Sequence, residues 1–145
     1  MFEIDEKVFI TLNDNQETES IWVLKKGDYF IVRNIPFFAK GIALDDLIMI
    51  DKQENKMFYK KTICFSGNST YRIFTNNDID SFDFFWKILE DFGCTFEKAT
   101  ENLYAVNVPS TSDIFKVYEV FELGEKRNIW EFEEGFCGHP SIFIK

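Results

Sequence analysis

The stretch "TYRIFTNNDIDSFDFFWKILEDFG", residues 70–93, decides the fold, because the hydrophobic rhythm of the chain changes within it. Residues 70–74 read as a short strand. Residues 77–93 read as a helix, because apolar side chains recur there at spacings of three and four. Asn77 or Asp78 is placed to cap the start of this helix, and Gly93 is placed to end it.

The residues that follow repeat the alternation of strand and helix. "CTFEKA" (94–99) and "LYAVNV" (103–108) are predicted strands on either side of a turn. "TSDIFKVYEVFELGEK" (111–126) is a predicted amphipathic helix, capped by its Thr or Ser, and "NIWEFEE" (128–134) is a closing strand. The order strand, helix, strand, strand, helix, strand is typical of a split βαβ (ferredoxin-like, βαββαβ) unit, with both helices on one face of a four-stranded antiparallel sheet.

The residues before this unit read as strand after strand. Five segments alternate apolar and polar residues or form short apolar runs, with small connections between them: "KVFITLN", "SIWVLKK", "DYFIVRN", "DLIMIDK" and "KMFYKKTICF". Such strands predict a small curled antiparallel sheet or barrel. We therefore expect an α+β fold with a β-rich, barrel-like half over residues 1–66, packed on a ferredoxin-like half with a C-terminal tail over 67–145. The two halves are expected to form one compact unit.

The composition indicates the kind of partner. The chain of 145 residues contains 18 Phe, 5 Tyr and 3 Trp, which is enough to fill a core and leave rings for an interface. Its formal net charge of -9 disfavours nucleic acid as a partner, because phosphates would be repelled, and favours a basic protein. We expect a monomer or a weak dimer.

The sequence also indicates where the protein acts. The N-terminal residues "MFEIDEKVFI" lack the basic start of a signal peptide, and no stretch approaches the roughly 20 apolar residues of a membrane span. A cytoplasmic protein without membrane contact is therefore expected. Cys64, Cys94 and Cys137 form no CxxC pair, so we expect reduced thiols, no metal site and no cofactor.

Few residues are arranged as a catalytic site would require. His139 is the only histidine, and Cys137 lies two residues before it, so a Cys–His pair is one candidate. The adjacent carboxylates Asp45 and Asp46 are another, although a turn explains them more simply. Because no nucleotide-binding or zinc-protease motif is present, we expect that the protein is not an enzyme.

An acidic cluster surrounds the second predicted helix and the closing strand. It is read either as a solvated face or as the rim of a site for a basic protein, with aromatic anchors inside the rim. The predicted partner-binding residues are Glu119, Glu122, Glu131, Glu133, Glu134, Trp130 and Phe136.

The segment "NIPFFAKG", residues 34–41, is the second candidate site. Pro36 is expected to end a strand, and Gly41 permits the turn back into the sheet. We favour a corner that closes the core. In the alternative interpretation, Phe37 and Phe38 form the lip of a cleft between the halves that Arg72 also lines.

Four motifs carry a resemblance to a known family. "NIPFFAKGIALDDLIMI", "SGNSTYRI", "GCTFEKATENLYAVNVP" and "WEFEEGFCG" are together similar to the bacterial family called domain of unknown function 4265, in the same order and over nearly the whole chain. This chain has Asp45 where the family usually has a glycine before the aspartate. The resemblance implies a complete, free-standing bacterial domain and carries over no activity, cofactor or catalytic residue.

Three functions follow as hypotheses. The favoured one is a non-enzymatic, acidic protein-binding module, in concrete form an immunity or antitoxin-like protein that neutralises a basic toxin. The alternative is a small-molecule or nucleotide-sensing domain with a cleft between the two halves. An enzyme that uses Cys137 and His139, or Asp45 and Asp46, is the third.

Overall fold

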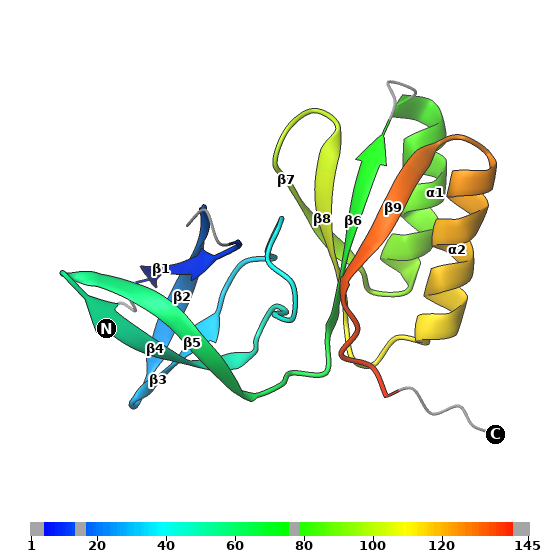
Figure 1. The fold of residues 1–145 in the computed structure, drawn as a ribbon. Coiled ribbons are helices and arrows are strands. Elements are labelled where there is room, and N and C mark those ends of the chain that lie inside the picture. The colour runs from blue at the N-terminus through cyan, green and yellow to red at the C-terminus, as the bar shows by residue number, and fades with distance from the viewer. Residues whose placement is uncertain (1–4, 14–16, 76–78, 141–145) are drawn as a thin grey trace.

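The computed structural model describes residues 5–13, 17–75 and 79–140, with the backbone alone described at Asp5 and Ile79 (Figure 1). The predicted cap of the first helix, at Asn77 or Asp78, lies outside the described residues. The chain has the predicted α+β class, with a five-stranded barrel followed by a four-stranded sheet and two helices.

The first five strands form a closed barrel in chain order. They are β1 (Asp5–Thr11), β2 (Thr18–Lys26), β3 (Tyr29–Val32), β4 (Leu47–Gln53) and β5 (Lys56–Cys64). Successive strands pair antiparallel, whereas β1 and β5 close the barrel in parallel through Phe9 and Phe58. The alternation along β2 places Ile21 and Val23 inside, so the sequence pattern follows the two sides of the barrel wall.

The second unit contains the remaining elements. They are β6 (Ser69–Thr75), α1 (Ile79–Asp91), β7 (Thr95–Lys98), β8 (Leu103–Val108), α2 (Ile114–Lys126) and β9 (Trp130–Phe136). The sheet has the order β7-β8-β6-β9 with antiparallel pairs, and both helices cover the same face (Figure 1). Each helix has 13 residues, and no helix in the described ranges is long and apolar enough to span a membrane.

The second helix begins one residue later than its predicted cap. Asp113, and not Thr111 or Ser112, is the N-cap, and its carboxylate accepts hydrogen bonds from the backbone of Phe115 and Lys116. Ser112 instead donates to the carbonyl of Phe92 at the end of α1, so it joins the two helices. A carboxylate at the N-cap accepts hydrogen bonds from first-turn amides that have no acceptor within the helix.

Stacked rings fill the space between the helices and the sheet. Tyr71 on β6 lies parallel to Phe121 on α2, with ring centroids 4.8 Å apart. Trp130 is only 3% exposed, and its indole N–H donates to the carbonyl of Phe121 at 2.9 Å. Gly124 makes room for it, because a Cβ there would overlap the indole. Trp130 therefore belongs to the core, and its ring is not available as the predicted surface anchor for a partner.

Candidate functional site

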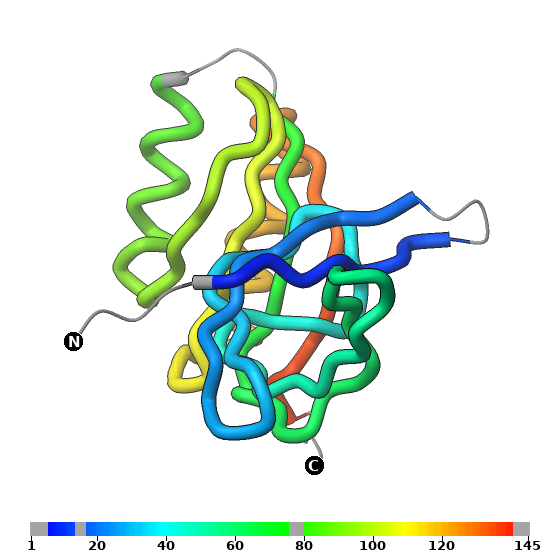
Figure 2. Tube along the Cα trace, turned by 90° about the vertical axis from the view of Figure 1, so that its left-hand side faces the viewer, coloured from blue at the N-terminus to red at the C-terminus, as the bar shows by residue number. Residues whose placement is uncertain are grey.

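The loop that contains the two adjacent phenylalanines lies between the barrel and the second sheet, as the cyan segment in Figures 1 and 2. The buried Glu19 carboxylate accepts hydrogen bonds from the amides of Phe37, Phe38 and Ala39 at 2.6, 3.0 and 2.8 Å. From the opposite sheet, Arg72 donates to the carbonyls of Phe37 and Ala39. The buried Glu19 carboxylate therefore satisfies backbone N–H groups of the loop, and the buried Arg72 guanidinium satisfies two of its carbonyl groups.

The side chain of Arg72 occupies the junction that was predicted to hold a cleft. It is 1% exposed, and its Nη1 lies 3.7 Å from Glu133 Oε1. Burial lowers the pKa of Arg72, while the nearby Glu133 and Glu19 carboxylates act in the opposite direction. Gly135 leaves space for the guanidinium, because a Cβ there would lie 2.5 Å from Nη1.

Phe37 and Phe38 differ in exposure. Phe37 is half-buried, whereas Phe38 is 57% exposed. Because the loop is fastened by Glu19 and Arg72, this geometry favours a packing corner over the lip of a ligand cleft.

The paired aspartates build a turn. Asp46 is fully buried and accepts hydrogen bonds from the amides of Ala43 at 2.9 Å and Ser66 at 2.8 Å. Burial raises the pKa of Asp46, and these two hydrogen bonds oppose the rise. Asp45 has a φ of 70°, the left-handed conformation that favours glycine, so the turn persists although this chain lacks the family's usual residue there. Asp45 itself is exposed, so the two side chains do not share one pocket.

The imidazole of His139 is engaged with groups other than a thiol. Its Nδ1 lies 2.6 Å from the hydroxyl of Ser69, and its Nε2 lies 2.9 Å from the carbonyl of Pro109. Cys137 contacts the backbone carbonyl of His139 at 3.7 Å, not the ring. Because His139 is buried, these contacts fasten the segment after β9 to β6 and do not present a Cys–His pair to solvent.

The predicted acidic cluster is divided between two faces of β9. Glu133 lies beside Arg72 on the face toward the barrel, and Glu131 pairs with Phe74 on β6. Glu134 instead lies on the helix side, where it accepts a hydrogen bond from the Tyr71 hydroxyl at 3.1 Å. Phe136 is half-buried and stacks on Phe65 at 5.5 Å. The seven predicted residues therefore do not form one surface.

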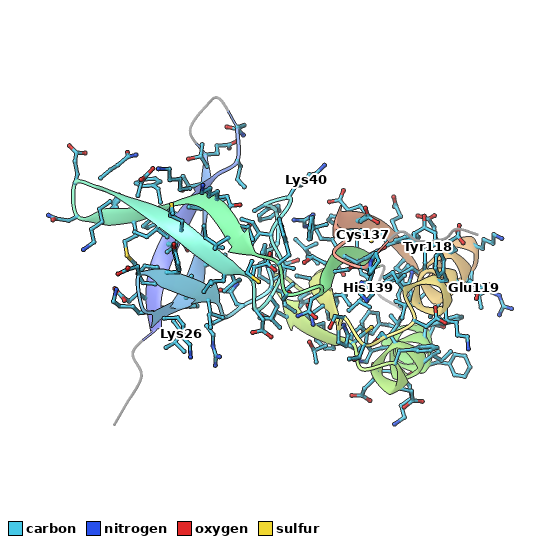
Figure 3. All side chains as sticks on the ribbon, turned by 90° about the horizontal axis from the view of Figure 1, so that it is seen from below. Lys26, Lys40, Tyr118, Glu119, Cys137 and His139 are labelled. Atoms are coloured by element: carbon cyan, nitrogen blue, oxygen red, sulfur yellow. The ribbon has the colours of Figure 1, made fainter. Side chains whose placement is uncertain are left out.

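A groove lies where α2 meets the end of β9. Its volume is about 440 Å³, and it is lined by Tyr71, Ile114, Phe115, Tyr118, Glu119, Glu122, Glu134, Cys137 and Pro140. Figure 3 shows Tyr118, Glu119 and Cys137 on the same part of the second unit. Phe115 and Tyr118 are 58% and 39% exposed, so large aromatic surface is open to solvent beside three carboxylates. We call this the α2–β9 groove.

One carboxylate of the groove is held in place from below. Tyr71 is 1% exposed, and its hydroxyl donates to Glu134 from the core side of the groove. Burial raises the pKa of Tyr71, with the Glu134 charge adding to the rise, so the hydroxyl keeps its proton and remains a donor. Glu134 therefore has a fixed position before any partner arrives, which lowers the ordering cost of binding.

Charge is unevenly distributed between the two units. Residues 67–145 contain 14 acidic and 7 basic side chains, whereas residues 1–66 contain 11 and 9. The unit that carries the groove thus accounts for -7 of the total of -9. A basic partner would be attracted to this unit more than to the barrel.

The groove contains residues that sequence reasoning did not select. Phe115, Tyr118 and Tyr71 were absent from the predicted site, although Glu119, Glu122 and Glu134 were included. The sequence did indicate that Phe115 is exposed, because this residue falls outside the apolar stripe of Ile114, Val117 and Phe121 on the predicted helix. Within the described ranges, no group of three His, Cys, Asp or Glu side chains is placed to hold a metal ion.

Known proteins share the sequence pattern and the fold. Residues 19–132 match the model of a family described as a domain of unknown function (DUF4265). The fold is similar to that of a hypothetical protein from Neisseria gonorrhoeae solved by crystallography. The TM-score is 0.80 at 22% sequence identity, and the match covers 97% of this chain and 100% of that one. No curated protein matches the chain. At this identity the structural match establishes a common fold and nothing about activity.

Proposed function

The chain belongs to the DUF4265 family, and we propose that it is a non-enzymatic module that binds a basic protein through the α2–β9 groove. One observation carries this proposal: exposed rings and three carboxylates, one of them hydrogen-bonded to Tyr71, lie together in a groove on the strongly acidic unit. Aromatic anchors surrounded by charge are typical of the residues that dominate binding energy at protein interfaces.

The chemistry of the groove suits lysine or arginine side chains of the partner. Such side chains have apolar stems that can pack on Phe115 and Tyr118 while their charged ends meet Glu119, Glu122 or Glu134. In its concrete form, we propose an immunity-like protein that neutralises a basic toxin, because the active sites of nucleases are themselves basic. We propose that the protein acts in the cytoplasm.

The geometry gives less support to a ligand cleft between the halves, because Arg72 fills the junction. We also assign the second unit to the split βαβ (ferredoxin-like) arrangement. The strand order β7-β8-β6-β9, with both helices on one face, supports that assignment.

Binding to the basic product of an adjacent gene tests the proposal directly. We expect a complex with a dissociation constant below about 1 μM, measured by titration calorimetry. Glu119→Lys should weaken the complex at least about tenfold, because it places a positive charge beside the incoming side chain. Glu101→Lys makes the same charge change on the turn between β7 and β8, outside the groove, and should weaken it far less. Equal loss from both variants, or no complex at micromolar concentration, would count against the proposal.

The cysteines supply a second readout in the same complex. Cys137 lines the groove, whereas Cys64 is an exposed thiol on β5 of the barrel. A partner seated in the groove should slow the alkylation of Cys137 at least about tenfold and leave Cys64 unchanged. Protection of Cys64 with free access to Cys137 would move the binding surface to the barrel.

A further inference from the structure

We propose a second binding site, for a nucleotide, on the outer face of the barrel where β1 meets β5. The base of the nucleotide stacks on aromatic rings of the two strands, and its phosphates contact lysine side chains. This site is separate from the α2–β9 groove, and the proposal does not depend on the function proposed for that groove.

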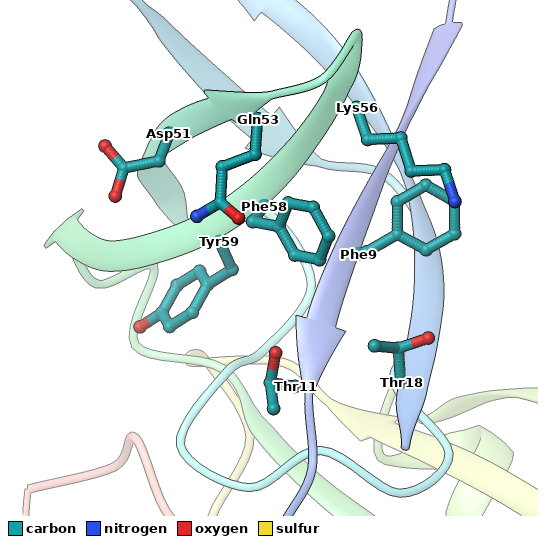
Figure 4. Close-up of a pocket in the computed structure, with 8 residues that line it drawn as sticks. All are labelled: Phe9, Thr11, Thr18, Asp51, Gln53, Lys56, Phe58 and Tyr59. Atoms are coloured by element: carbon teal, nitrogen blue, oxygen red, sulfur yellow. The ribbon is translucent and has the colours of Figure 1, made fainter. Parts of the chain in front are cut away.

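The seam between β1 and β5 is one of two short pairings in the barrel wall. Among the described residues these strands pair at Phe9 and Phe58, and β3 pairs with β4 at two positions, whereas β1 with β2, and β4 with β5, each pair over seven. A groove of about 570 Å³ opens along this seam (Figure 4). Its walls are formed by Phe9, Thr11, Thr18, Asp51, Gln53, Lys56, Phe58 and Tyr59. The volume lies within the range of small-ligand sites.

The rings in this groove are placed for stacking. Phe9 and Phe58 are half-buried, with centroids 5.8 Å apart and planes inclined at 41°. Figure 4 shows both rings next to one another at the groove, with Thr11 below them. Their neighbours Val8 and Met57 occupy the barrel core, so these rings are outward-facing positions of the pleat and not core packing. Any nucleobase can stack on such rings, because every base has a flat π-face.

Lysine side chains border the same rings. Lys56 Nζ lies 5.4 Å from the centroid of Phe9, and Lys56 is exposed. An adjoining groove of about 430 Å³ shares Phe9 and Lys56 and adds Lys7 and Lys52. Phosphate groups that extend from a stacked base along the seam would therefore meet Lys56 first, whereas the Lys7 ammonium lies over the Trp22 ring, 5.0 Å from its centroid, and would have to turn toward the phosphates.

Acidic side chains in the two grooves leave Lys56 available. The Asp51 carboxylate lies 3.9 Å from Lys60, and Figure 4 shows it pointing away from Lys56. Glu6 lines the adjoining groove only. In addition, all nine basic side chains of residues 1–66 are exposed, whereas the acids Glu19 and Asp46 are buried. The barrel surface is thus less acidic than the total charge indicates, so it repels an anion less than the second unit does.

Neutral polar side chains that line the groove complete the chemistry. The Gln53 amide and the Thr11 and Thr18 hydroxyls both donate and accept hydrogen bonds, as the edges of a base or a ribose require. Rings, one lysine and neutral polar groups in a groove of small-molecule size, with two more lysines in the adjoining groove, favour a mononucleotide over an uncharged aromatic ligand or inorganic phosphate.

Titration of the full chain with ATP, adenosine and tripolyphosphate, each without metal, tests this inference. In two-dimensional amide NMR spectra we expect ATP to shift the resonances of Phe9, Phe58 and Lys56. Adenosine and tripolyphosphate should each bind at least about fivefold more weakly than ATP. Adenosine lacks the phosphates that contact lysine, and tripolyphosphate lacks the base that stacks on the rings. Shifts confined to other elements, or no shift at millimolar ATP, would overturn the proposal. So would binding of a single-stranded oligonucleotide without binding of ATP.

Matched variants separate the site from general electrostatics. Lys56→Ala should weaken ATP at least about fivefold and leave adenosine unchanged, because only the phosphates meet the ammonium group. Lys26→Ala removes another exposed lysine, near the hairpin between β2 and β3 and labelled in Figure 3, and should have little effect. Phe58→Leu, which keeps an apolar side chain on β5, should weaken both ATP and adenosine. Equal effects of the two lysine variants would refute the site.

Discussion

Strand β6 is buried on both faces of the β7-β8-β6-β9 sheet from Ser69 to Ile73, but the two faces are built from opposite chemistry. Toward the helices, β6 presents Tyr71 and Ile73 to a cluster of stacked rings. Toward the barrel, the same strand presents Thr70 and Arg72, and Arg72 meets backbone carbonyls of the loop. Apolar packing on the first face tolerates small shifts of position, whereas the second depends on individual hydrogen bonds.

This difference teaches how the two units are joined. The helix face holds one unit together through apolar area, which is not directional. The barrel face joins two units through charged groups with specified partners: Glu19, Arg72 and Glu97, whose carboxylate accepts from the amide of Ile35 at 2.8 Å. Such contacts fix the relative position of the units. Removal of a single partner therefore leaves buried groups unsatisfied.

Phe121→Ala tests the helix face, and we expect the largest effect there. Phe121 is fully buried and stacks on Tyr71 and Phe132, so its loss should lower the free energy of unfolding by about 3–5 kcal/mol. Urea denaturation followed by circular dichroism measures the change. Phe84→Ala is the control, because Phe84 is 66% exposed, and it should change stability by less than about 0.5 kcal/mol. Similar losses in both variants would contradict the described core.

Arg72→Met tests the barrel face with a side chain of similar length. The carbonyls of Phe37 and Ala39 would lose their charged donor, and we expect a loss of about 2–4 kcal/mol in the free energy of unfolding. The exposed Arg33 supplies the control as Arg33→Met, which should be nearly neutral. If Arg72→Met stabilised the protein, the junction would be better described as apolar packing, and the contrast between the two faces would fail.

The smallest expected effect is a pH dependence at the edge of the junction, at Asp46. Burial raises the pKa of Asp46 above its ordinary value of 3.8. The folded chain therefore holds this proton more tightly than the unfolded chain, and stability from this group is greatest at low pH. It declines as pH rises from 3.8 through the raised pKa and is constant above it.

The Asp46→Asn variant isolates this contribution. It should lower the free energy of unfolding by about 1–2 kcal/mol across the pH range measured, because an NH₂ group replaces one of the two acceptor oxygens. The deficit relative to the parent should be larger near pH 4 than at pH 7, as measured by denaturation curves across that range. A deficit that grows toward pH 7 would reverse the assigned direction.

The elements that repeat simple patterns were predictable from the sequence. The strand at 103–108 was predicted with its observed bounds, and the helices and their order follow from spacings of three and four. The resemblance to the DUF4265 family is confirmed over residues 19–132. In these segments the apolar positions of the sequence coincide with the buried side of the strand or helix.

Other residues could not be placed in this way. Trp130 alternates with glutamates on β9, a pattern that does not distinguish a ring under a helix from a ring at a surface. Glu133 and Glu134 are adjacent on β9 and so lie on opposite faces of the sheet, but the sequence does not show which face the barrel covers. Glu19 did leave a signal, because it occupies the inward position of the alternation that Ile21 and Val23 continue.

The position of Arg72 in the chain also bears on the order in which the protein is made. The ribosome releases β1 to β5 first, and Glu19 can then bind the amides of the loop, since both lie within that part of the chain. The guanidinium that binds the loop's carbonyls comes with β6, after the barrel strands. Until then water must hydrate those carbonyls, so the last corner of the barrel is completed by a strand that is not part of it.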